Sequence, residues 1–176
     1  ISIPYYFGIE NISFLNAYFE AISGFTSTGF TIFENIRQLD ESLILWRSTS
    51  QWMGGIYFLF SILLLIDIFD KNLKQSFTEY LSFNYNEILK QSLKIIIIYS
   101  SLTLLIFILF KTINLRTFDA FNLSLSIISS GGFLPVNRID FLFESDLSKI
   151  VLSFSMMLSF FSLFLIYNLI FFNKKK

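Results

Sequence analysis

Two segments of this 176-residue chain repeat each other without a gap at an offset of 103 residues. The segment FLNAYFEAISGFTSTGF at 14–30 lies over TFDAFNLSLSIISSGGF at 117–133, and Ile36 then falls on Ile139. Each copy holds a short apolar segment, a run of Ser, Thr and Gly, a polar stretch and a long apolar run. A repeat of a whole unit constrains the fold before any single residue does. We therefore expect two copies of one structural unit.

Three long apolar runs are consistent with helices that cross a membrane. They cover about 43–69, 95–110 and 150–172, and the last has no charged residue in 23 positions. A helix of about 20 apolar residues spans the hydrocarbon core of a bilayer. The chain is also 54% hydrophobic and only 15% charged, against about a quarter charged in soluble domains. We predict an all-α membrane protein in contact with the lipid bilayer, with transmembrane helices at about 43–69, 93–113 and 149–172.

Composition excludes several classes of function. The chain has no Cys and no His, which excludes disulfides, Cys/His zinc sites and Cys or His nucleophile arrangements. The net charge is zero, so no basic field indicates nucleic acid binding. No carboxylate pair recurs at acid/base spacing on one apolar face, and no GxxxxGK loop is present. We expect no enzyme here. Because the chain begins with Ile1 and ends in three lysines after an apolar run, we expect a fragment.

Two shorter apolar segments, 14–25 and 118–129, are too short to cross a bilayer. Such lengths suit re-entrant or buried helices, and Asn16 and Asp119 could cap their starts. Each leads into a run of small residues, TSTGF at 26–30 and SSGGF at 129–133. One such run alone could simply let helices pack closely. Two at a fixed offset favour loops whose carbonyl oxygens replace the water shell of a cation, with glycine supplying the unusual backbone angles.

Charged residues suggest an orientation and raise two further questions. The polar segment 70–91 and the terminal lysines are expected on the cytoplasmic side, and the acidic residues near the glycine runs on the outer side. Arg47 precedes an apolar run, so we expect it to extend to the interface as an anchor. Glu20 lies within the first short apolar segment, where tuning of a pore field and ordinary hydrogen bonding are both open.

Three runs in order carry a resemblance to a known family. They are NAYFEAISGFTSTGFT at 16–31, WRSTSQWMGG at 46–55 and DAFNLSLSIISSGGF at 119–133. Together they resemble the pore loops and intervening helix of the Trk/Ktr/HKT cation transporter superfamily, in its Trk-type potassium uptake branch. That family has four helix–pore loop–helix repeats, so the resemblance implies that two of the four are present.

The resemblance also divides the chain. Residues 1–69 would be the first repeat, with pore helix 14–25 and filter 26–30. Residues 70–91 would be a cytoplasmic linker. Residues 92–173 would be the second repeat, with pore helix 118–129 and filter 129–133.

By the same resemblance, the function is potassium uptake through a selectivity filter of backbone carbonyls. The ion-binding residues would be Ser27, Thr28, Gly29, Ser130, Gly131 and Gly132. The transported potassium ion needs no organic cofactor. The resemblance further implies a multi-pass protein of the bacterial inner membrane, a homodimer, and a cytosolic nucleotide-binding regulatory subunit of the TrkA type.

Alternatives to potassium uptake stay open. One is a sodium-permeable member of the superfamily, where the first filter loop often has Ser in place of Gly29. Another is a membrane scaffold whose glycine loops only pack helices. The chain also departs from the family pattern at Ser27, at Phe30 and at Ile56-Tyr57.

Overall fold

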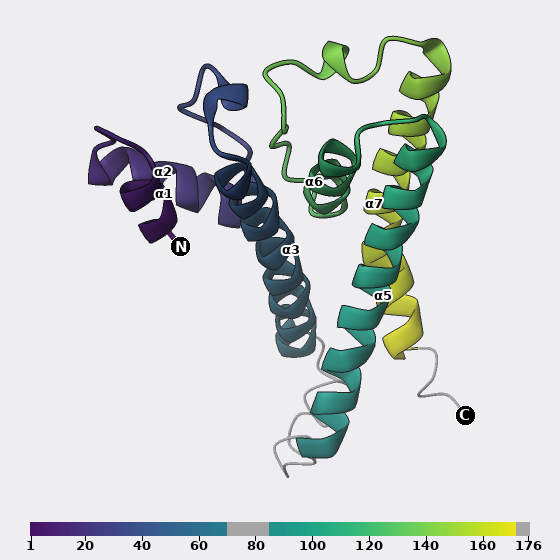
Figure 1. The fold of residues 1–176 in the computed structure, drawn as a ribbon. Helices are drawn as coiled ribbons and strands as arrows, with labels where there is room; N and C mark the ends of the chain where they lie inside the picture. Colours follow the sequence, from purple (N-terminus) through teal and green to yellow (C-terminus); the bar gives the residue numbers. More distant parts are fainter. Residues whose placement is uncertain (70–84, 172–176) are drawn as a thin grey trace.

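The computed structural model describes the backbone of residues 1–69 and 85–171 and the side chains of residues 1–61 and 92–161. Every regular element in these ranges is helical, and no strand occurs within them. Figure 1 shows the arrangement. The elements are α1 (Ile3–Gly8), α2 (Phe14–Phe25), η1 (Ile36–Gln38), α3 (Glu41–Phe69), α5 (Tyr85–Thr112), α6 (Thr117–Ile128), η2 (Ile139–Phe141) and α7 (Asp146–Phe171).

The sequence repeat is also a backbone repeat. Helices α2 and α6 each have 12 residues, and they begin 103 positions apart, as do η1 and η2. Positive φ angles recur at the same offset in three pairs. They are Asn11 and Asn114 at 60°, Ser27 and Ser130 at 54°, and Gly29 and Gly132 at 80° and 75°. Two independent stretches of chain therefore adopt the same unusual path before and after each short helix.

The starts of the short helices differ from the expected caps. Ser13 caps α2, where its hydroxyl accepts a hydrogen bond from the backbone N–H of Asn16 at 3.2 Å. Asp119 lies in the first turn of α6, which starts after Arg116 without a side-chain cap. The predictions for Asn16 and Asp119 are wrong. In both units the helix begins three residues after the left-handed asparagine, which is earlier than a cap at Asn16 or Asp119 would place it.

Helix α5 begins earlier than its apolar run. It starts at Tyr85, so residues 85–91, which we assigned to the linker, are helical, and 70–84 lie outside the described residues. The sequence from 85 to 112 contains no Gly or Pro, so nothing ends the helix where its apolar part ends. Among the described side chains, Ser92–Thr112 forms the one helix long and apolar enough to cross a membrane.

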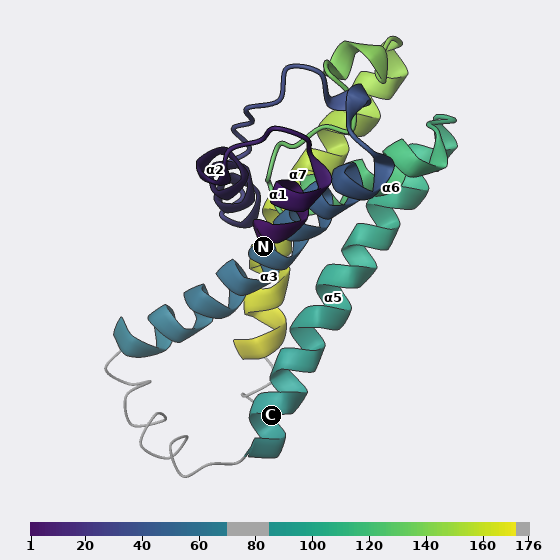
Figure 2. The ribbon, with the colours of Figure 1, turned by 60° about the vertical axis from the view of Figure 1, so that its left-hand side comes forward.

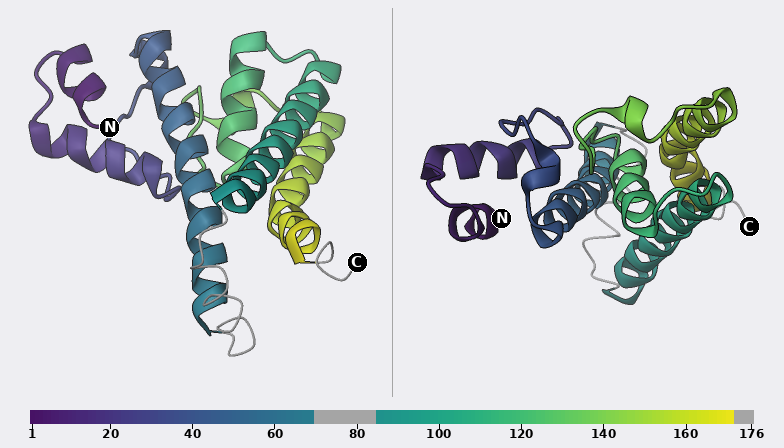
Figure 3. Two further views of the ribbon diagram at one scale, coloured as in Figure 1. Left: turned by 90° about the horizontal axis from the view of Figure 1, so that it is seen from below. Right: turned by 45° about the horizontal axis from the view of Figure 1, so that its top comes forward.

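Helix α3 lies between the two short helices. Figure 3 shows α1 and α2 on one side of α3 and α6 on the other. Helices α5 and α7 both pack on α6. Fully buried apolar side chains of α5, including Ile106 and Phe110, join those of α6, such as Ala120 and Leu123, in one core. The opposite face of α5 exposes large apolar residues, with Ile97 at 61% and Leu104 at 58%, which suits an apolar surrounding.

The ends of the long helices gather on one side of the molecule. Figures 1 and 2 show the end of α3, the start of α5 and the end of α7 at one end, and η1 and η2 at the other. The second unit thus starts and ends on the same side, and the first unit ends on that side as well. This arrangement lets both glycine loops enter from the same side.

The fold generates a prediction on topology. Single cysteines at Asn86 and Glu144, in an otherwise cysteine-free full-length protein, should react with an impermeant thiol reagent from opposite sides. The reason is that Asn86 lies in the first turn of α5 and Glu144 lies between η2 and α7. The measurement is labelling of intact cells before and after permeabilisation. Labelling of both cysteines in intact cells would contradict the arrangement.

Candidate functional site

Each short helix ends in the same hydrogen-bonded turn. In the first unit, the N–H of Ser27 donates to the carbonyl of Gly24 at 3.0 Å, and the N–H of Thr28 donates to the carbonyl of Ser23 at 3.0 Å. This pattern is a Schellman motif, in which the residue after the cap takes a left-handed conformation and is usually glycine. Here it is serine, which adds about 1–2 kcal/mol of local strain. The second unit repeats both bonds, from Ser130 to Ile127 and from Gly131 to Ser126, each at 2.9 Å.

The carbonyl oxygens of the two loops fall into two groups. Those of Phe30 and Gly131 accept side-chain hydrogen bonds at 2.5 Å, from the hydroxyl of Ser23 and from Nε2 of Gln51 respectively. No hydrogen bond within the described part of the chain uses the other carbonyls at the predicted filter positions. These belong to Ser27, Thr28, Gly29, Ser130 and Gly132. Five of the six predicted residues therefore keep a carbonyl free for a ligand, and Gly131 does not.

The two loops are immediate neighbours. A Cβ placed on Gly29 would clash with the carbonyl oxygen of Gly131, so backbone from one unit touches backbone from the other. Helices α2 and α6 both end at these loops, and the C-terminal end of a helix carries partial negative charge. The position where the loops meet therefore favours a cation. Within the described residues, no group of three or more Asp or Glu side chains lies close enough to hold a metal ion.

A buried ion pair connects α3 to the first unit. Nε of Arg47 lies 2.9 Å from Oε1 of Glu20, and the two side chains are 1% and 0% exposed. Glu20 also accepts hydrogen bonds from the hydroxyl of Thr31 at 3.0 Å and from the N–H of Ile32 at 3.1 Å. A buried charge needs such partners to be tolerated. Glu20 therefore uses hydrogen bonds to fix the position of the segment that follows the first loop.

The same arginine reaches the second unit. Its guanidinium donates to the carbonyl of Leu134 at 3.4 Å, and its Cζ lies 4.1 Å from the centre of the Phe133 ring. The prediction that Arg47 anchors its helix at the membrane interface is wrong, because the carboxylate of Glu20 balances the charge of Arg47 inside the protein. Arg47 instead joins the chain segments that follow both loops.

Gln51, one turn further along α3, holds the second loop. Besides its bond to Gly131, its Oε1 accepts hydrogen bonds from the hydroxyl of Ser126 at 2.7 Å and from the N–H of Phe133 at 3.3 Å. The side chain is fully buried. Three bonds from one amide thus hold the last turn of α6 and the middle and end of the loop. The sequence pointed to this residue only through the WRSTSQWMGG run, without a role.

Two adjacent glycines let α3 approach both short helices. A Cβ on Gly54 would clash with the carbonyl of Phe25 at the end of α2. A Cβ on Gly55 would clash with the Tyr99 hydroxyl and lie 2.9 Å from Cβ of Ser129 at the end of α6. Small residues permit this close approach between helices. Close packing of α3 against α2 on one side and against α6 on the other therefore explains the two adjacent glycines.

The second unit has the same backbone arrangement as the first, but different side chains occupy the equivalent positions. Ser159 of α7 donates to the carbonyl of Ile128 at 3.2 Å, where Gly54 faces the carbonyl of Phe25 in the first unit. Gly54 and Ser159 are 105 positions apart, as are the starts of α3 and α7. At this offset Leu152 is the counterpart of Arg47, and Leu123 of α6 is the counterpart of Glu20 at the offset of 103. Leucines thus replace the ion pair.

Comparison with known proteins places the chain in a family. No protein-family model matches it. The uncharacterized cation transporter MJ1485 of Methanocaldococcus jannaschii is 32% identical over 156 residues, which cover 86% of this chain and 32% of that protein. The Trk system potassium uptake protein TrkI of Halomonas elongata is 46% identical over 55 residues, 31% of this chain and 11% of that protein. The chain belongs to the Trk-type transporter family.

A further member of that family, the Trk system potassium uptake protein TrkG of Escherichia coli, is 28% identical over 158 residues, 85% of this chain and 32% of that protein. Trk-type transporters are membrane proteins, which agrees with the helical fold and its exposed apolar faces. The chain spans about a third of the length of the relatives that it matches over most of its own residues.

The buried pair generates a prediction on stability. In the full-length protein, Glu20→Leu or Arg47→Leu alone should lower stability by about 3–5 kcal/mol, because each leaves an unpaired buried charge. The double variant should lose less than either single one, because Leu123 and Leu152 already fill the counterpart positions. The measurement is the midpoint of thermal unfolding in detergent.

The exposed pair of Arg116 and Glu41 supplies the control, since its side chains are 63% and 58% exposed. Its double leucine variant should unfold close to the wild-type midpoint, because exposed pairs add little stability. If the losses at Glu20 and Arg47 simply add in the double variant, the two residues do not act as a pair.

Proposed function

We propose that this chain forms half of the selectivity filter of a potassium uptake protein. The observation that carries the proposal is the recurrence of left-handed backbone at Ser27 and Gly29 and, 103 residues on, at Ser130 and Gly132. The two loops touch, follow helix ends of negative polarity and keep carbonyls free of protein hydrogen bonds. A cation that sheds water needs oxygen ligands of this kind. The names of the Trk relatives support potassium as the ion.

The proposed filter uses backbone rather than side chains. Carbonyls of Ser27, Thr28, Gly29, Ser130 and Gly132 would face the ion, and the carbonyl of Gly131 would instead fix the loop to Gln51. Two loops form only half of a four-loop ring, so two further units would complete it.

We extend the proposal to the surroundings of the filter. The protein would be a multi-pass protein of the bacterial inner membrane, with residues 70–91 on the cytoplasmic side. It would work as a homodimer with a nucleotide-binding regulatory subunit of the TrkA type.

Gly132 separates this function from the scaffold alternative. A glycine used for packing has close neighbours, as Gly54 and Gly55 have. A Cβ on Gly132 would meet nothing within 4 Å, yet the residue has a φ of 75°. Close packing therefore does not explain why glycine stands there, whereas the loop conformation does. The sodium-permeable alternative is disfavoured by Gly29, at the position where sodium-permeable relatives often have serine.

The filter generates a prediction on selectivity. In the full-length protein, Gly29→Ser and Gly132→Ser should each reduce discrimination of potassium against sodium about tenfold. A side chain at a left-handed position costs about 1–2 kcal/mol, and about 1.4 kcal/mol is a tenfold change in preference. Gly29→Ser should have the larger effect, because its side chain would also clash with Gly131. The assay is flux of both cations, with growth on limiting potassium.

Matched controls lie in the same loops. Ser27→Gly and Ser130→Gly should keep the flux ratio, because glycine adopts their φ of 54° without strain. Thr28→Ser should be mild, since serine keeps the carbonyl. If both glycine variants reach the membrane and retain the wild-type ratio, the loops are not the filter.

A further inference from the structure

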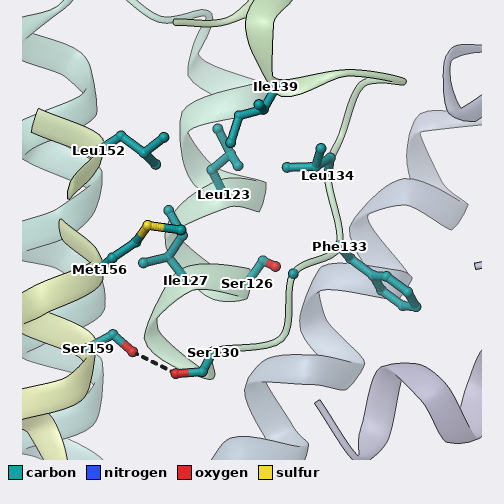
Figure 4. Close-up of a pocket in the computed structure, with 11 residues that line it drawn as sticks. Leu123, Ser126, Ile127, Ser130, Phe133, Leu134, Ile139, Leu152, Met156 and Ser159 are labelled. Atoms are coloured by element: carbon teal, nitrogen blue, oxygen red, sulfur yellow. Dashed lines mark hydrogen bonds between the residues drawn. The ribbon is translucent and has the colours of Figure 1, made fainter. Parts of the chain in front are cut away.

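A pocket of about 410 Å³ lies between α6, α7 and the chain that follows the second loop. Figure 4 shows Leu152, Met156 and Ser159 of α7 on one side of it, and Ile127 of α6 facing them. The lining is mostly apolar, and the hydroxyls of Ser130 and Ser159 lie together at one end of it. At the corresponding position of the first unit, a side chain of the second unit fills the space between the described helices.

That side chain is Phe133, which is 2% exposed. Its surroundings, here called the Phe133 seat, are Gly24, Arg47 and Gln51. A Cβ on Gly24 would lie 3.0 Å from the ring, the Arg47 guanidinium stacks on the ring, and Gln51 accepts a hydrogen bond from its backbone N–H. Figure 4 shows the ring directed away from the pocket, toward α3. The second unit thus inserts an aromatic side chain into the first.

The pocket is built from the counterparts of the Phe133 seat. Gly24 corresponds to Ile127 at the offset of 103, and Arg47 and Gln51 correspond to Leu152 and Met156 at the offset of 105. All three counterparts line the pocket, together with Ser159, the counterpart of Gly54. The pocket is therefore the same seat one unit further along.

Phe30 gives an independent observation at the other edge of the chain. It is the counterpart of Phe133, and it follows the first loop as Phe133 follows the second. Phe30 is nevertheless 70% exposed. Phe133 thus occupies a seat, Phe30 is exposed outside any seat, and the pocket is a seat that holds no aromatic side chain. This is the pattern of units that associate head to tail.

We infer that the pocket between α6 and α7 receives an aromatic side chain from a third helix–loop unit of the same polypeptide. The relatives matched over most of this chain are about three times as long as the matched region, which leaves room for further units. Leu152 replaces Arg47, so this contact is apolar, without the stacked guanidinium of the first seat. The inference rests on the proposed function, in which more than two units surround one pore axis.

Neighbouring methionines allow a matched test. Met156 and Met157 are 54% and 57% exposed, and only Met156 lines the pocket. A diazirine residue close to methionine in size is placed at either position of the full-length protein in its native membrane, and photo-crosslinked peptides are identified by mass spectrometry. Position 156 should crosslink, within one polypeptide, to the segment just after a third Ser/Gly loop, and position 157 should not.

Two results would overturn the inference. One is that both positions give the same lipid adducts and no such peptide, which would make the pocket a lipid-facing groove. The other is that position 156 crosslinks to a second copy of the chain, seen as a dimer on a denaturing gel. The measurement reads packing and not ion passage. The crosslinking result therefore does not depend on whether the glycine variants change ion selectivity, so the two proposals can fail separately.

Discussion

Irregular backbone in an apolar surrounding needs hydrogen-bond partners from the protein itself. In this chain, α3 supplies many of them. Gln51 binds backbone at the middle and end of the second loop, and Arg47, paired with Glu20 of α2, holds the segments that leave both loops. The glycine pair of α3 brings the helix close enough for these contacts. The position of either loop therefore depends on a helix that belongs to the first unit but serves both.

The two units show one backbone stabilised by two kinds of chemistry. The first unit uses a buried ion pair, whose attraction must offset the cost of taking both charges out of water. The second unit has leucines at the counterpart positions and no such cost. The shared loop conformation thus does not require charge. The ion pair instead connects the two units, because Arg47 contacts both Glu20 and the segment after the second loop.

The sequence was sufficient for the repeat and the helical class, because apolar run lengths and glycine positions are local signals. The assignment of the six loop residues to a filter stays a prediction. It was insufficient for partners that lie far apart in the chain. Arg47 looked interfacial since its carboxylate partner lies 27 positions earlier, and Gln51 binds residues 75–82 positions away. The counterparts of Arg47 and Gln51 were hidden as well. The offset changes from 103 to 105 before α7, so a gap-free comparison aligns the wrong helix faces.

The adjacent glycines of α3 have a mechanical consequence. The described hydrogen bonds that join this helix to the two loops and the segments after them involve Arg47 and Gln51, which both precede the glycine pair. Glycine pairs are also where helices bend most readily. A bend at this pair would therefore leave those hydrogen bonds in place.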